Sequence, residues 1–491
     1  MINLPDDFVK RIHEQLKDEA DDFLESYNRD HEKSLRINIR KNKAGIVPFV
    51  KDIAARVYND SLGNDIYEKA RVKWEKKGLY YQEASEMSED EATEADNTRL
   101  ILKEPGKSPL HAAGAYYIQE ASAMLPVTLL NIDSVEDAKP LKVLDLCAAP
   151  GGKSTQIADY MNGRGLLISN EIISSRAKIL SENIERMAVT NAMVISEDPL
   201  NLAPRFPYYF DRILVDAPCS GEGMFRKHPQ VCDEWSLENV SICAERQKYI
   251  LDCASKMLDM SGRIVYSTCT FAPEEDEAVI DDFLENHPEF IRASQYIRIF
   301  PNRERGEGHF AAVLERRDKV MSKYGLKSRH TGKIVDSVQL NILTSFIKDN
   351  LKSCSLLGIT DTDTINKGMT KEVKDRLLMF GDNIYLGPEY MPDIKGLSVL
   401  RPGLHLGTIT KGRFEPAHAF ALALTQEEVK RVYDTGCFSA EVSAYLRGLT
   451  LNADIPNGWC LVCTEGMSIG WAKGVNGILK NHYPKGLRIQ G

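Results

Sequence analysis

Residues 142–155 read Lys-Val-Leu-Asp-Leu-Cys-Ala-Ala-Pro-Gly-Gly-Lys-Ser-Thr, an apolar run that passes into small residues. This pattern predicts a buried strand at 142–147, a turn, and a helix that follows it. In open α/β sheets, ligands bind at the carboxyl ends of the strands, and a turn of small residues lets a ligand approach the backbone amides. The turn satisfies neither the dinucleotide pattern G-x-G-x-x-G nor the Walker pattern G-x-x-x-x-G-K-[ST]. An adenosyl cofactor without a polyphosphate fits this stretch better.

The alternation of apolar strands and helical stretches continues outward, from residue 107 to 316. This rhythm is typical of an α/β fold with a parallel, doubly wound sheet. A helix that covers the sheet is expected at 239–260, because apolar residues recur there with helical spacing. The strands that we expect are 142–147, 165–170, 192–196, 212–216, 263–267 and 309–314.

Acidic residues follow three of these strands. Glu171 comes 20 residues after Gly151, at the end of the second strand, where a carboxylate can accept both hydroxyls of a ribose. Asp198 ends the third strand and Asp216 ends the fourth. One such residue is more often a helix cap or a turn residue. Four consecutive strands that end in a small-residue turn or an acid favour a ligand site at this edge.

Two cysteines follow the fourth and fifth expected strands, Cys219 after Asp-Ala-Pro and Cys269 after Ser-Thr. Both thiols should therefore lie at the same edge of the sheet. A thiolate adds readily to an electron-poor carbon, and a pyrimidine offers one when an acid stabilises its ring nitrogen. We expect the cysteines at 232, 243, 253, 354 and 437 to be buried as small hydrophobic residues.

Cys460 and Cys463 form a C-x-x-C, a spacing that is common among zinc ligands. Residues 458–463 nevertheless read as one strand, in which the two thiols would point to opposite faces. The sequence offers no second C-x-x-C and no His pair to complete such a site. We therefore expect no metal.

The composition places the chain among ordinary globular proteins. Its 491 residues suffice for about three domains, and 43% hydrophobic with 27% charged residues exclude whole-chain disorder or a fibrous repeat. No stretch reaches the roughly 18 apolar residues of a membrane-spanning helix. The first residues also lack the features of a secretory signal. We expect a cytoplasmic protein with reduced thiols.

The formal net charge of −9 argues, on bulk electrostatics, against a nucleic-acid partner. The charge is unevenly distributed, however. Residues 83–96 carry seven acids and no base, 315–333 carry seven Lys or Arg against two acids, and 466–491 carry four Lys or Arg and no acid. Phosphate contacts depend on such local surfaces, so the bulk charge does not exclude RNA.

The remaining segments suggest the domain organisation. A helical pattern at 5–27 and an alternating strand pattern at 34–40 form a leading module, and a helix at 337–352 precedes a β-rich region. The divisions that we expect are an N-terminal module at 1–106 with a solvated acidic insertion at 83–96, an α/β domain at 107–316, a basic linker at 317–336 and a C-terminal region at 337–491.

Taken together, these motifs resemble the Nol/Nop/Sun family of RNA cytosine-5 methyltransferases, and within it the bacterial RsmF-type ribosomal RNA enzymes. The resemblance rests on residues 144–153, 170–171, 216–226 and 267–270, and it extends to 35–38, 114–120 and 306–310. Residues 400–407, 412–418 and 480–488 resemble the C-terminal extension of that group. The acidic segment 83–96 has no counterpart that we can place.

The resemblance implies a Rossmann-like class I methyltransferase domain, an N-terminal RNA-binding module and a β-rich, PUA-like RNA-binding domain. It also implies S-adenosyl-L-methionine as cofactor and ribosomal RNA or the small ribosomal subunit as partner, with a monomeric protein and no membrane. The cofactor residues that it implies are Cys147, Ala148, Ala149, Pro150, Gly151, Gly152, Lys153, Glu171, Asp198 and Asp216.

The resemblance further implies four catalytic residues. Cys269 would attack C6 of a cytosine, so that C5 takes the methyl group. Asp216, helped by Lys153, would hold and protonate N3. Cys219 would act in removing the C5 proton and releasing the enzyme. Because the target base must leave its stack, a loop, a bulge or an immature ribosomal segment is the expected substrate.

Two alternatives stay open at this point. The same chemistry could act on transfer RNA, although the RsmF-like extension favours ribosomal RNA. A ribosome-assembly or RNA-binding factor could keep the fold without turnover, although the intact cofactor and thiol motifs disfavour this interpretation.

Overall fold

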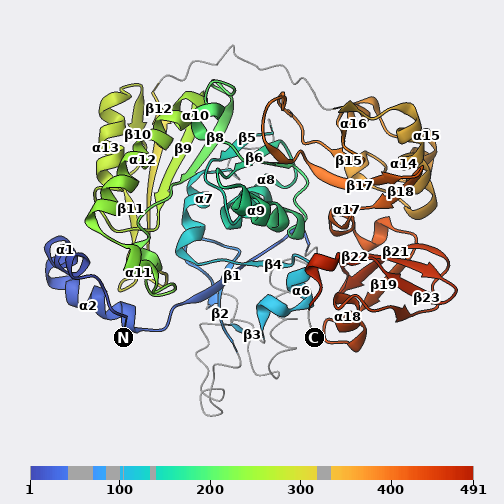
Figure 1. Cartoon of the computed structure of the whole chain (residues 1–491), viewed down its shortest axis with the longest axis horizontal. Helices are drawn as coiled ribbons and strands as arrows, with labels where there is room; N and C mark the ends of the chain where they lie inside the picture. The colour runs from blue at the N-terminus through green and yellow to red at the C-terminus, as the bar shows by residue number, and fades with distance from the viewer. Residues whose placement is uncertain are drawn as a thin grey trace.

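The computed structural model describes residues 2–41, 70–83, 100–102, 104–132, 140–317 and 333–489. Apart from Glu83, the acidic insertion expected at 83–96 lies outside these residues, and so does most of the expected basic linker. The described residues form four sheets, of which the largest occupies the centre of the chain (Figure 1). None of the helices that they form is long and apolar enough to cross a membrane.

The central sheet has the order β10-β12-β9-β8-β5-β6-β7-β16, with β11 paired to β12. Its five inner strands, from β9 to β7, are parallel, as expected. Their bounds are β5 at Lys142–Asp145, β6 at Leu166–Asn170, β7 at Ala192–Ile195, β8 at Phe210–Asp216 and β9 at Leu258–Thr268.

The expectation of a wholly parallel sheet is wrong for the sixth strand, β12 (His309–Arg316), which pairs antiparallel with β9. The chain leaves β9 through α13 (Glu277–Asn286), β10 (Phe290–Arg292) and β11 (Ile297–Ile299). It then enters β12 through a loop, without the crossover helix that a parallel pairing requires. The first residue of β12, not its last, therefore lies at the carboxyl edge of the parallel strands.

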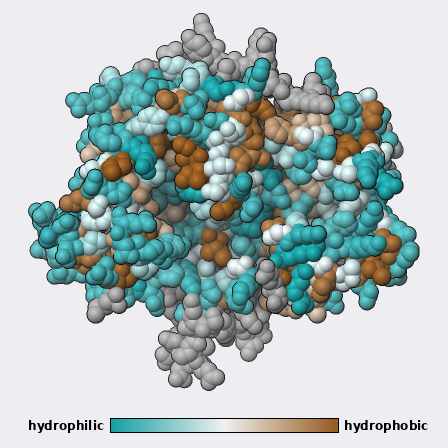
Figure 2. Space-filling view, viewed as in Figure 1, coloured by the Kyte–Doolittle hydropathy of each residue, from teal (hydrophilic) through white to brown (hydrophobic). Residues whose placement is uncertain are grey.

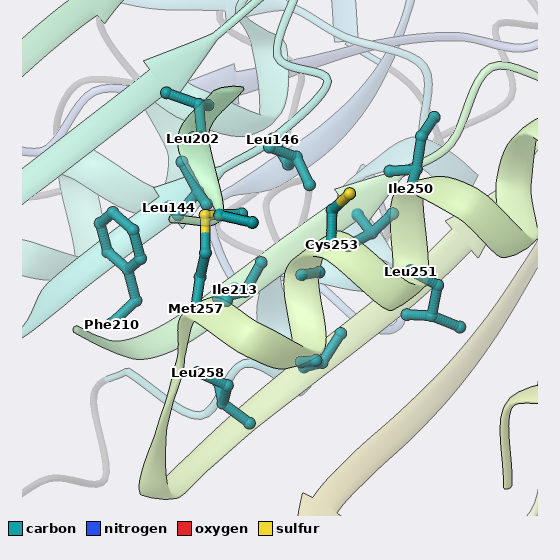
Figure 3. Close-up of a cluster of buried hydrophobic side chains, with 14 of the residues drawn as sticks. Leu144, Leu146, Leu202, Phe210, Ile213, Ile250, Leu251, Cys253, Met257 and Leu258 are labelled. Atoms are coloured by element: carbon teal, nitrogen blue, oxygen red, sulfur yellow. The ribbon is translucent and has the colours of Figure 1, made fainter. Parts of the chain in front are cut away.

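Alternate residues of the parallel strands belong to two hydrophobic cores, one on each face of the sheet. Leu144 and Ile213 belong to one core, where they pack with α12 (Leu237–Met257), while Val143 and Leu214 belong to the other. Figure 3 shows the first core, with Cys253 of α12 buried among aliphatic side chains. The second core lies against α8 (Gly152–Met161) and α9 (Ser174–Arg186). Burial on both faces explains the continuous apolar runs in the sequence.

The N-terminal sheet has the order β3-β2-β1-β4. Its strands are β1 at Lys33–Ile37, β2 at Gly78–Glu83, β3 at Leu100–Leu102 and β4 at Tyr116–Ile118. The single helix expected at 5–27 is two helices, α1 (Asp6–Leu16) and α2 (Ala20–Glu25). The chain breaks between them because Lys17 takes a positive φ of 50° and begins a short 3-10 turn.

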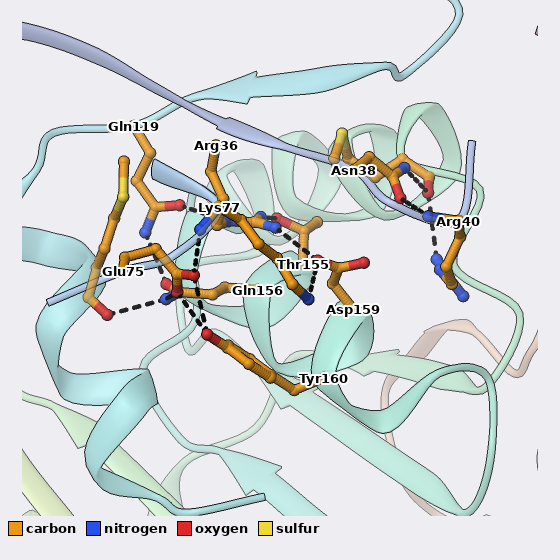
Figure 4. Close-up of polar contacts among 12 residues, drawn as sticks. Arg36, Asn38, Arg40, Glu75, Lys77, Gln119, Thr155, Gln156, Asp159 and Tyr160 are labelled. Carbon is orange, nitrogen blue, oxygen red and sulfur yellow. Dashed lines mark hydrogen bonds and ion pairs between the residues drawn. The ribbon is translucent and has the colours of Figure 1, made fainter. Parts of the chain in front are cut away.

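A buried polar network joins this N-terminal module to α8 (Figure 4). Arg36 of β1 is fully buried and donates to the Thr155 hydroxyl at 2.9 Å. The Asp159 carboxylate forms an ion pair with the Lys77 ammonium at 2.7 Å. Glu75 accepts from the Tyr160 hydroxyl at 2.9 Å and from Gln156. Burial lowers the pKa of Arg36, and nearby acids such as Asp159 partly offset this effect. Four polar residues of one helix are thus held by segments far away in the sequence.

The C-terminal region, expected as one smaller β-rich unit, contains two sheets with the orders β13-β14-β15-β17-β18 and β19-β21-β22-β23-β20. The bounds of the first are β13 at Lys333–Ile334, β14 at Leu377–Phe380, β15 at Asn383–Leu386, β17 at Leu404–Thr410 and β18 at Arg413–Pro416. Those of the second are β19 at Val432–Thr435, β20 at Leu451–Asn452, β21 at Gly458–Thr464, β22 at Met467–Val475 and β23 at Ile478–Asn481. The helix expected at 337–352 is α14 (Ser337–Asn350).

The C-terminal region packs against the rest of the chain. The short strand β16 (Val399–Arg401) pairs with β7 and extends the central sheet. The last sheet shares one hydrophobic core with the N-terminal sheet, in which Leu35 and Tyr116 meet Tyr445 and Ile469. Figure 2 shows a largely hydrophilic face, with hydrophobic residues gathered over the middle of the molecule.

Cys460 and Cys463 lie on β21 and belong to different cores, which confirms that their thiols point to opposite faces. The five cysteines expected to be small hydrophobic residues, at 232, 243, 253, 354 and 437, are all buried.

Candidate functional site

A cavity of about 720 Å³ lies at the carboxyl edge of the central sheet, where the sequence pattern places a ligand. This volume falls within the range of small-molecule sites. The expected site residues that line it are Cys147, Ala149, Glu171, Asp198, Asp216, Cys219 and Cys269. The expected residues outside its lining are Ala148, Pro150, Gly151, Gly152 and Lys153.

The turn between β5 and α8 depends on its two glycines. Gly151 has a φ of +113°, which favours glycine, and a Cβ there would lie 3.0 Å from Leu180 of α9. A Cβ on Gly152 would lie 3.3 Å from the Tyr117 ring. The amide of Ala148 donates to the carbonyl of Asn170 at 2.8 Å, so the turn is held against the end of β6. Small residues therefore let the turn sit close beneath the cavity.

The two acids that follow β6 and β7 are held in place by neighbouring groups. Glu171 is only 3% exposed, and its carboxylate lies 3.1 Å from the Arg176 guanidinium. Asp198 caps the short helix α10 (Pro199–Leu202) and also accepts a 2.8 Å hydrogen bond from the Tyr249 hydroxyl. Asp198 is thus both a helix cap and a cavity residue.

Asp216 stands at the end of β8 with three groups around its carboxylate. The Lys153 ammonium lies 2.8 Å from Oδ2, the Ser267 hydroxyl donates to Oδ1 at 2.8 Å, and His309 Nε2 lies 3.6 Å from Oδ1. Burial alone would raise the pKa of Asp216, but Lys153 and His309 outweigh it and hold this pKa well below its ordinary value. Burial likewise opposes the charge of Lys153, but Asp216 raises its pKa. Both groups are therefore ionised at neutral pH.

Cys219 and Cys269 lie next to each other in the wall of the cavity, with 3.3 Å between their sulfur atoms. The hydrogen bond with Cys269 and, second, burial raise the pKa of Cys219 well above its ordinary value. Cys219 therefore carries a proton at neutral pH, which it can share with the Cys269 sulfur. The two thiols expected at one sheet edge are in contact, beside an ion pair.

Interlocking loops fix the two thiols. Gly223 donates its amide to the Cys269 carbonyl at 2.9 Å, and a Cβ on Gly223 would collide with that carbonyl oxygen. The carboxylate of Glu222 is buried and accepts from Trp235 and from the Phe271 amide, both at 2.9 Å. The loops after β8 and β9 are thus one packed unit, which explains the small and charged residues at 219–226.

Sequence reasoning assigned no role to Ser267, His309, Tyr249 or Arg176. Ser267 stands two residues before Cys269 on β9, so its position was within reach of the strand-end argument. His309 could not be found in this way, because it begins a strand that runs antiparallel to its neighbour. Among the described residues, no group of three or more His, Cys, Asp or Glu side chains is arranged to hold a metal ion.

Comparison with known families gives matches along most of the chain. Residues 4–121 match the N-terminal domain of 16S rRNA methyltransferase RsmF, and residues 129–315 match 16S rRNA methyltransferase RsmB/F. Residues 364–424 match the first C-terminal domain of RsmF rRNA methyltransferase, and residues 439–489 match the methyltransferase RsmF PUA domain. The expected fold class, a methyltransferase domain with a C-terminal PUA-like domain, is thereby confirmed.

Individual proteins show the same similarity. Ribosomal RNA small subunit methyltransferase F of Erwinia tasmaniensis is 32% identical over 403 residues, which cover 78% of this chain and 80% of that protein. The protein of the same name from Aeromonas salmonicida is 29% identical, with 99% and 97% covered. A solved methyltransferase homologue from Pyrococcus horikoshii shares the fold, with a TM-score of 0.51 and 24% identity over 64% of this chain and 96% of that one.

Proposed function

Since this chain belongs to the family of RsmB/F 16S rRNA methyltransferases, we propose that it transfers a methyl group from S-adenosyl-L-methionine to C5 of a cytidine in small-subunit ribosomal RNA. In this proposal, residues 107–316 carry out the transfer, and residues 1–106 and 337–491 contact the RNA. We further propose that the protein is cytoplasmic and monomeric and uses no metal.

One observation carries the proposed chemistry: two thiols in contact lie beside an ionised Asp216–Lys153 pair on the wall of one cavity. A thiol nucleophile needs an electron-poor carbon, and a cytosine ring becomes one at C6 when charge on its N3 edge is stabilised. The arrangement supplies both requirements at the same place. A second thiol within 3.3 Å of the first offers a group for a later proton transfer.

The residues around the cavity fit the cofactor. The buried Glu171 carboxylate would accept the ribose hydroxyls, and Asp198, beside Tyr249, would lie near the adenine. Gly151 and Gly152 leave no side chain at the turn below. When bound, S-adenosyl-L-methionine supplies an electrophilic methyl group. A wall that combines carboxylates with apolar side chains such as Ile172 suits an adenosyl group.

Asp216 and Lys153 would act on the N3 edge of the cytosine. Because Asp216 is ionised at neutral pH, the proton that N3 gains would come from the Lys153 ammonium and pass through the Asp216 carboxylate. As this proton moves, the Cys269 sulfur, whose own proton has gone to solvent, bonds to C6, and the C5–C6 double bond opens so that electron density builds at C5. C5 then bonds to the methyl group while the bond between that methyl group and the cofactor sulfur breaks. Stabilising charge as it develops is the main contribution expected of such a pair.

Release requires loss of the proton from C5 and cleavage of the bond between Cys269 and C6. Cys219 is the base that we propose for this step. Its hydrogen bond with Cys269 is the first cause of its raised pKa, and that cause disappears once the Cys269 sulfur is bonded to carbon. Cys219 can then give its own proton to solvent and accept the one from C5. The electrons of the C5–H bond re-form the C5–C6 double bond, the bond between Cys269 and C6 breaks, and the N3 proton returns through Asp216 to Lys153. The two cysteines thus serve successive steps.

The last sheet offers a surface for RNA phosphates. Lys473 of β22 stands opposite Lys480 of β23 and opposite Trp459 of β21. Like charges in directly opposite positions destabilise a sheet, and the Lys473 ammonium lies 5.4 Å from the centre of the Trp459 ring. An RNA backbone would supply the missing negative charge, in spite of the net charge of −9.

The decisive experiment supplies the purified protein with S-adenosyl-L-methionine labelled in its methyl group, together with small-subunit ribosomal RNA, assembled subunits or transfer RNA. We expect label in 5-methylcytidine of the ribosomal RNA, detected by mass spectrometry of its nucleosides. Bisulfite sequencing of RNA from a deletion strain and from wild type would locate the cytidine. Label in transfer RNA would favour the first alternative, and absence of cofactor binding would favour a non-catalytic RNA-binding factor.

A further inference from the structure

His309 is a buried polar side chain for which the proposed function has no use. It begins β12, is 2% exposed, and does not belong to the lining of the cavity. Neither of its ring nitrogens has a hydrogen-bond partner among the described residues. Burying an imidazole in this way is costly, so its place next to a reactive carboxylate calls for an explanation.

The backbone holds the imidazole firmly in this position. His309 pairs with Ile299 of β11, and the next residue pairs with Thr268 of β9. Gly308 before it has a φ of +118°, and a Cβ there would lie 2.2 Å from the Phe271 ring. The Arg226 guanidinium contacts the neighbouring Glu307 at 2.8 Å. The ring is therefore aimed at Asp216 by a loop that has little freedom to move.

The charges around the ring determine its protonation. Burial, first, and the Lys153 ammonium lower the pKa of His309, while Asp216 and Glu120 raise it by a smaller amount. Besides His309, Asp216 faces Lys153 and Ser267, and it interacts with Asp145 on β5. The net effect keeps the imidazole neutral at neutral pH. It can then donate one N–H, but it does not compete with Lys153 as a second cation.

We propose that His309 is a positioning residue that donates its Nε2–H to Asp216 while the Lys153 proton is on its way to the substrate; this rests on the proposed function. At rest, Lys153 occupies Oδ2, and His309 Nε2 stands 3.6 Å from Oδ1. Once the ammonium gives up its proton, the carboxylate loses its main partner. A movement of a few tenths of an ångström brings the imidazole N–H within hydrogen-bond distance of Oδ1. No proton leaves His309 in this step.

The test compares His309→Phe, which keeps a ring without a donor, with His309→Gln, which keeps an N–H donor. For His309→Phe we expect kcat to fall about 10- to 100-fold, while the KM for S-adenosyl-L-methionine changes less than about threefold. The acidic limb of the pH–rate profile should move to higher pH, because His309 helps to keep the pKa of Asp216 low. His309→Gln should recover part of the rate and of the shift.

A matched control is His405→Phe. His405 is a half-buried histidine whose Nε2 also lacks a hydrogen-bond partner among the described residues, but it lies on β17 against Tyr385, and burial lowers its pKa to about 4. Its replacement should change stability without changing kcat or the pH profile.

The outcomes separate this inference from the proposed function. An inactive wild-type protein would overturn the proposed function itself. An active wild type whose His309→Phe variant keeps the same kcat and the same acidic limb would overturn the role of His309 alone. Failure of both His309 variants to fold, with His405→Phe folded, would also overturn it, because the imidazole would then serve the fold.

Discussion

Helix α8 takes part in two ionic clusters that differ in what surrounds them. At its start, Lys153 pairs with Asp216, which lines the 720 Å³ cavity beside two thiols. Further along, Asp159 pairs with Lys77 in the network of Figure 4, and neither residue lines that cavity. A carboxylate paired with a lysine is thus common to both clusters, but only the second pair is fully buried. A carboxylate marks a reaction site only where a cavity and a reactive group lie beside it.

The largest expected effect concerns the thiol itself. Cys269→Ala should abolish methyl transfer, a fall of about 10⁴-fold or more, because it removes the thiol that forms the bond to C6. Cys354→Ala is the control: this cysteine is buried in a core of the C-terminal region and does not line the cavity, so the variant should lose some stability and keep its rate. Rates of methyl transfer to ribosomal RNA give the comparison, and an active Cys269→Ala protein would refute the assigned nucleophile.

The next effect compares the carboxylates of the two clusters through their kinetics. Asp216→Asn removes the charge that stabilises the N3 edge, so kcat should fall by about 10²- to 10³-fold. Asp159→Asn should leave kcat within about threefold of wild type, because it touches no reacting atom. Steady-state kinetics of both variants decide the matter. Equal losses of kcat in the two variants would contradict the claim that Asp216 takes part in the reaction and Asp159 does not.

The free energy of unfolding should respond to the two substitutions in the opposite order to kcat. Asp159→Asn leaves Lys77 and Arg36 buried with one carboxylate fewer, which should cost roughly 3 kcal/mol in the free energy of unfolding. Urea denaturation followed by fluorescence measures this loss. Asp216→Asn, whose carboxylate borders a cavity, should cost less, and a larger cost for Asp216→Asn would contradict the account.

A third acid near α8, Asp145, makes the stability of the protein depend on pH. Burial raises the pKa of Asp145, which accepts a hydrogen bond from Ser154 at 2.7 Å, to about 7. Between about pH 4 and 7 the folded chain therefore keeps a proton that the unfolded chain has lost. This term makes stability fall as the pH rises through that window, by at most about 1.4 kcal/mol per unit.

The variant Asp145→Asn isolates this term, because the groups whose pKa values Asp145 raises, Cys147 and Lys153, titrate above this pH window. Its stability should fall less than that of wild type between pH 5 and 7, as measured by urea midpoints. Parallel curves for the two proteins would show that Asp145 is ionised throughout.

The smallest expected effect concerns RNA binding by two lysines that belong to neither cluster. Replacing Lys473 and Lys480 by Ala together should weaken RNA binding about tenfold at low salt, and less at high salt, because two phosphate contacts are lost. Filter binding over a range of salt concentrations would measure it, with the methylation rate at saturating RNA as the control. Unchanged affinity and salt dependence would remove this sheet from the RNA surface.

The sequence was sufficient to predict the edge of the sheet where Asp216, Cys219 and Cys269 meet, because parallel strands bring their ends together whatever the packing. It could not reveal His309, since that depends on the direction of β12. The partners of α8 were equally hidden: Arg36 and Thr155 are far apart in the sequence, and nothing local marks the pair. The second C-terminal sheet likewise follows from packing between distant segments.

The central claim, a covalent bond between Cys269 and the target cytidine, can be tested most directly with Cys219→Ala. This variant should stall before the C5 proton is lost. After incubation with S-adenosyl-L-methionine and labelled ribosomal RNA, a denaturing gel should show a stable protein–RNA adduct that disappears when Cys269 is also replaced by Ala. Absence of the adduct, or its persistence in the double variant, would contradict the account.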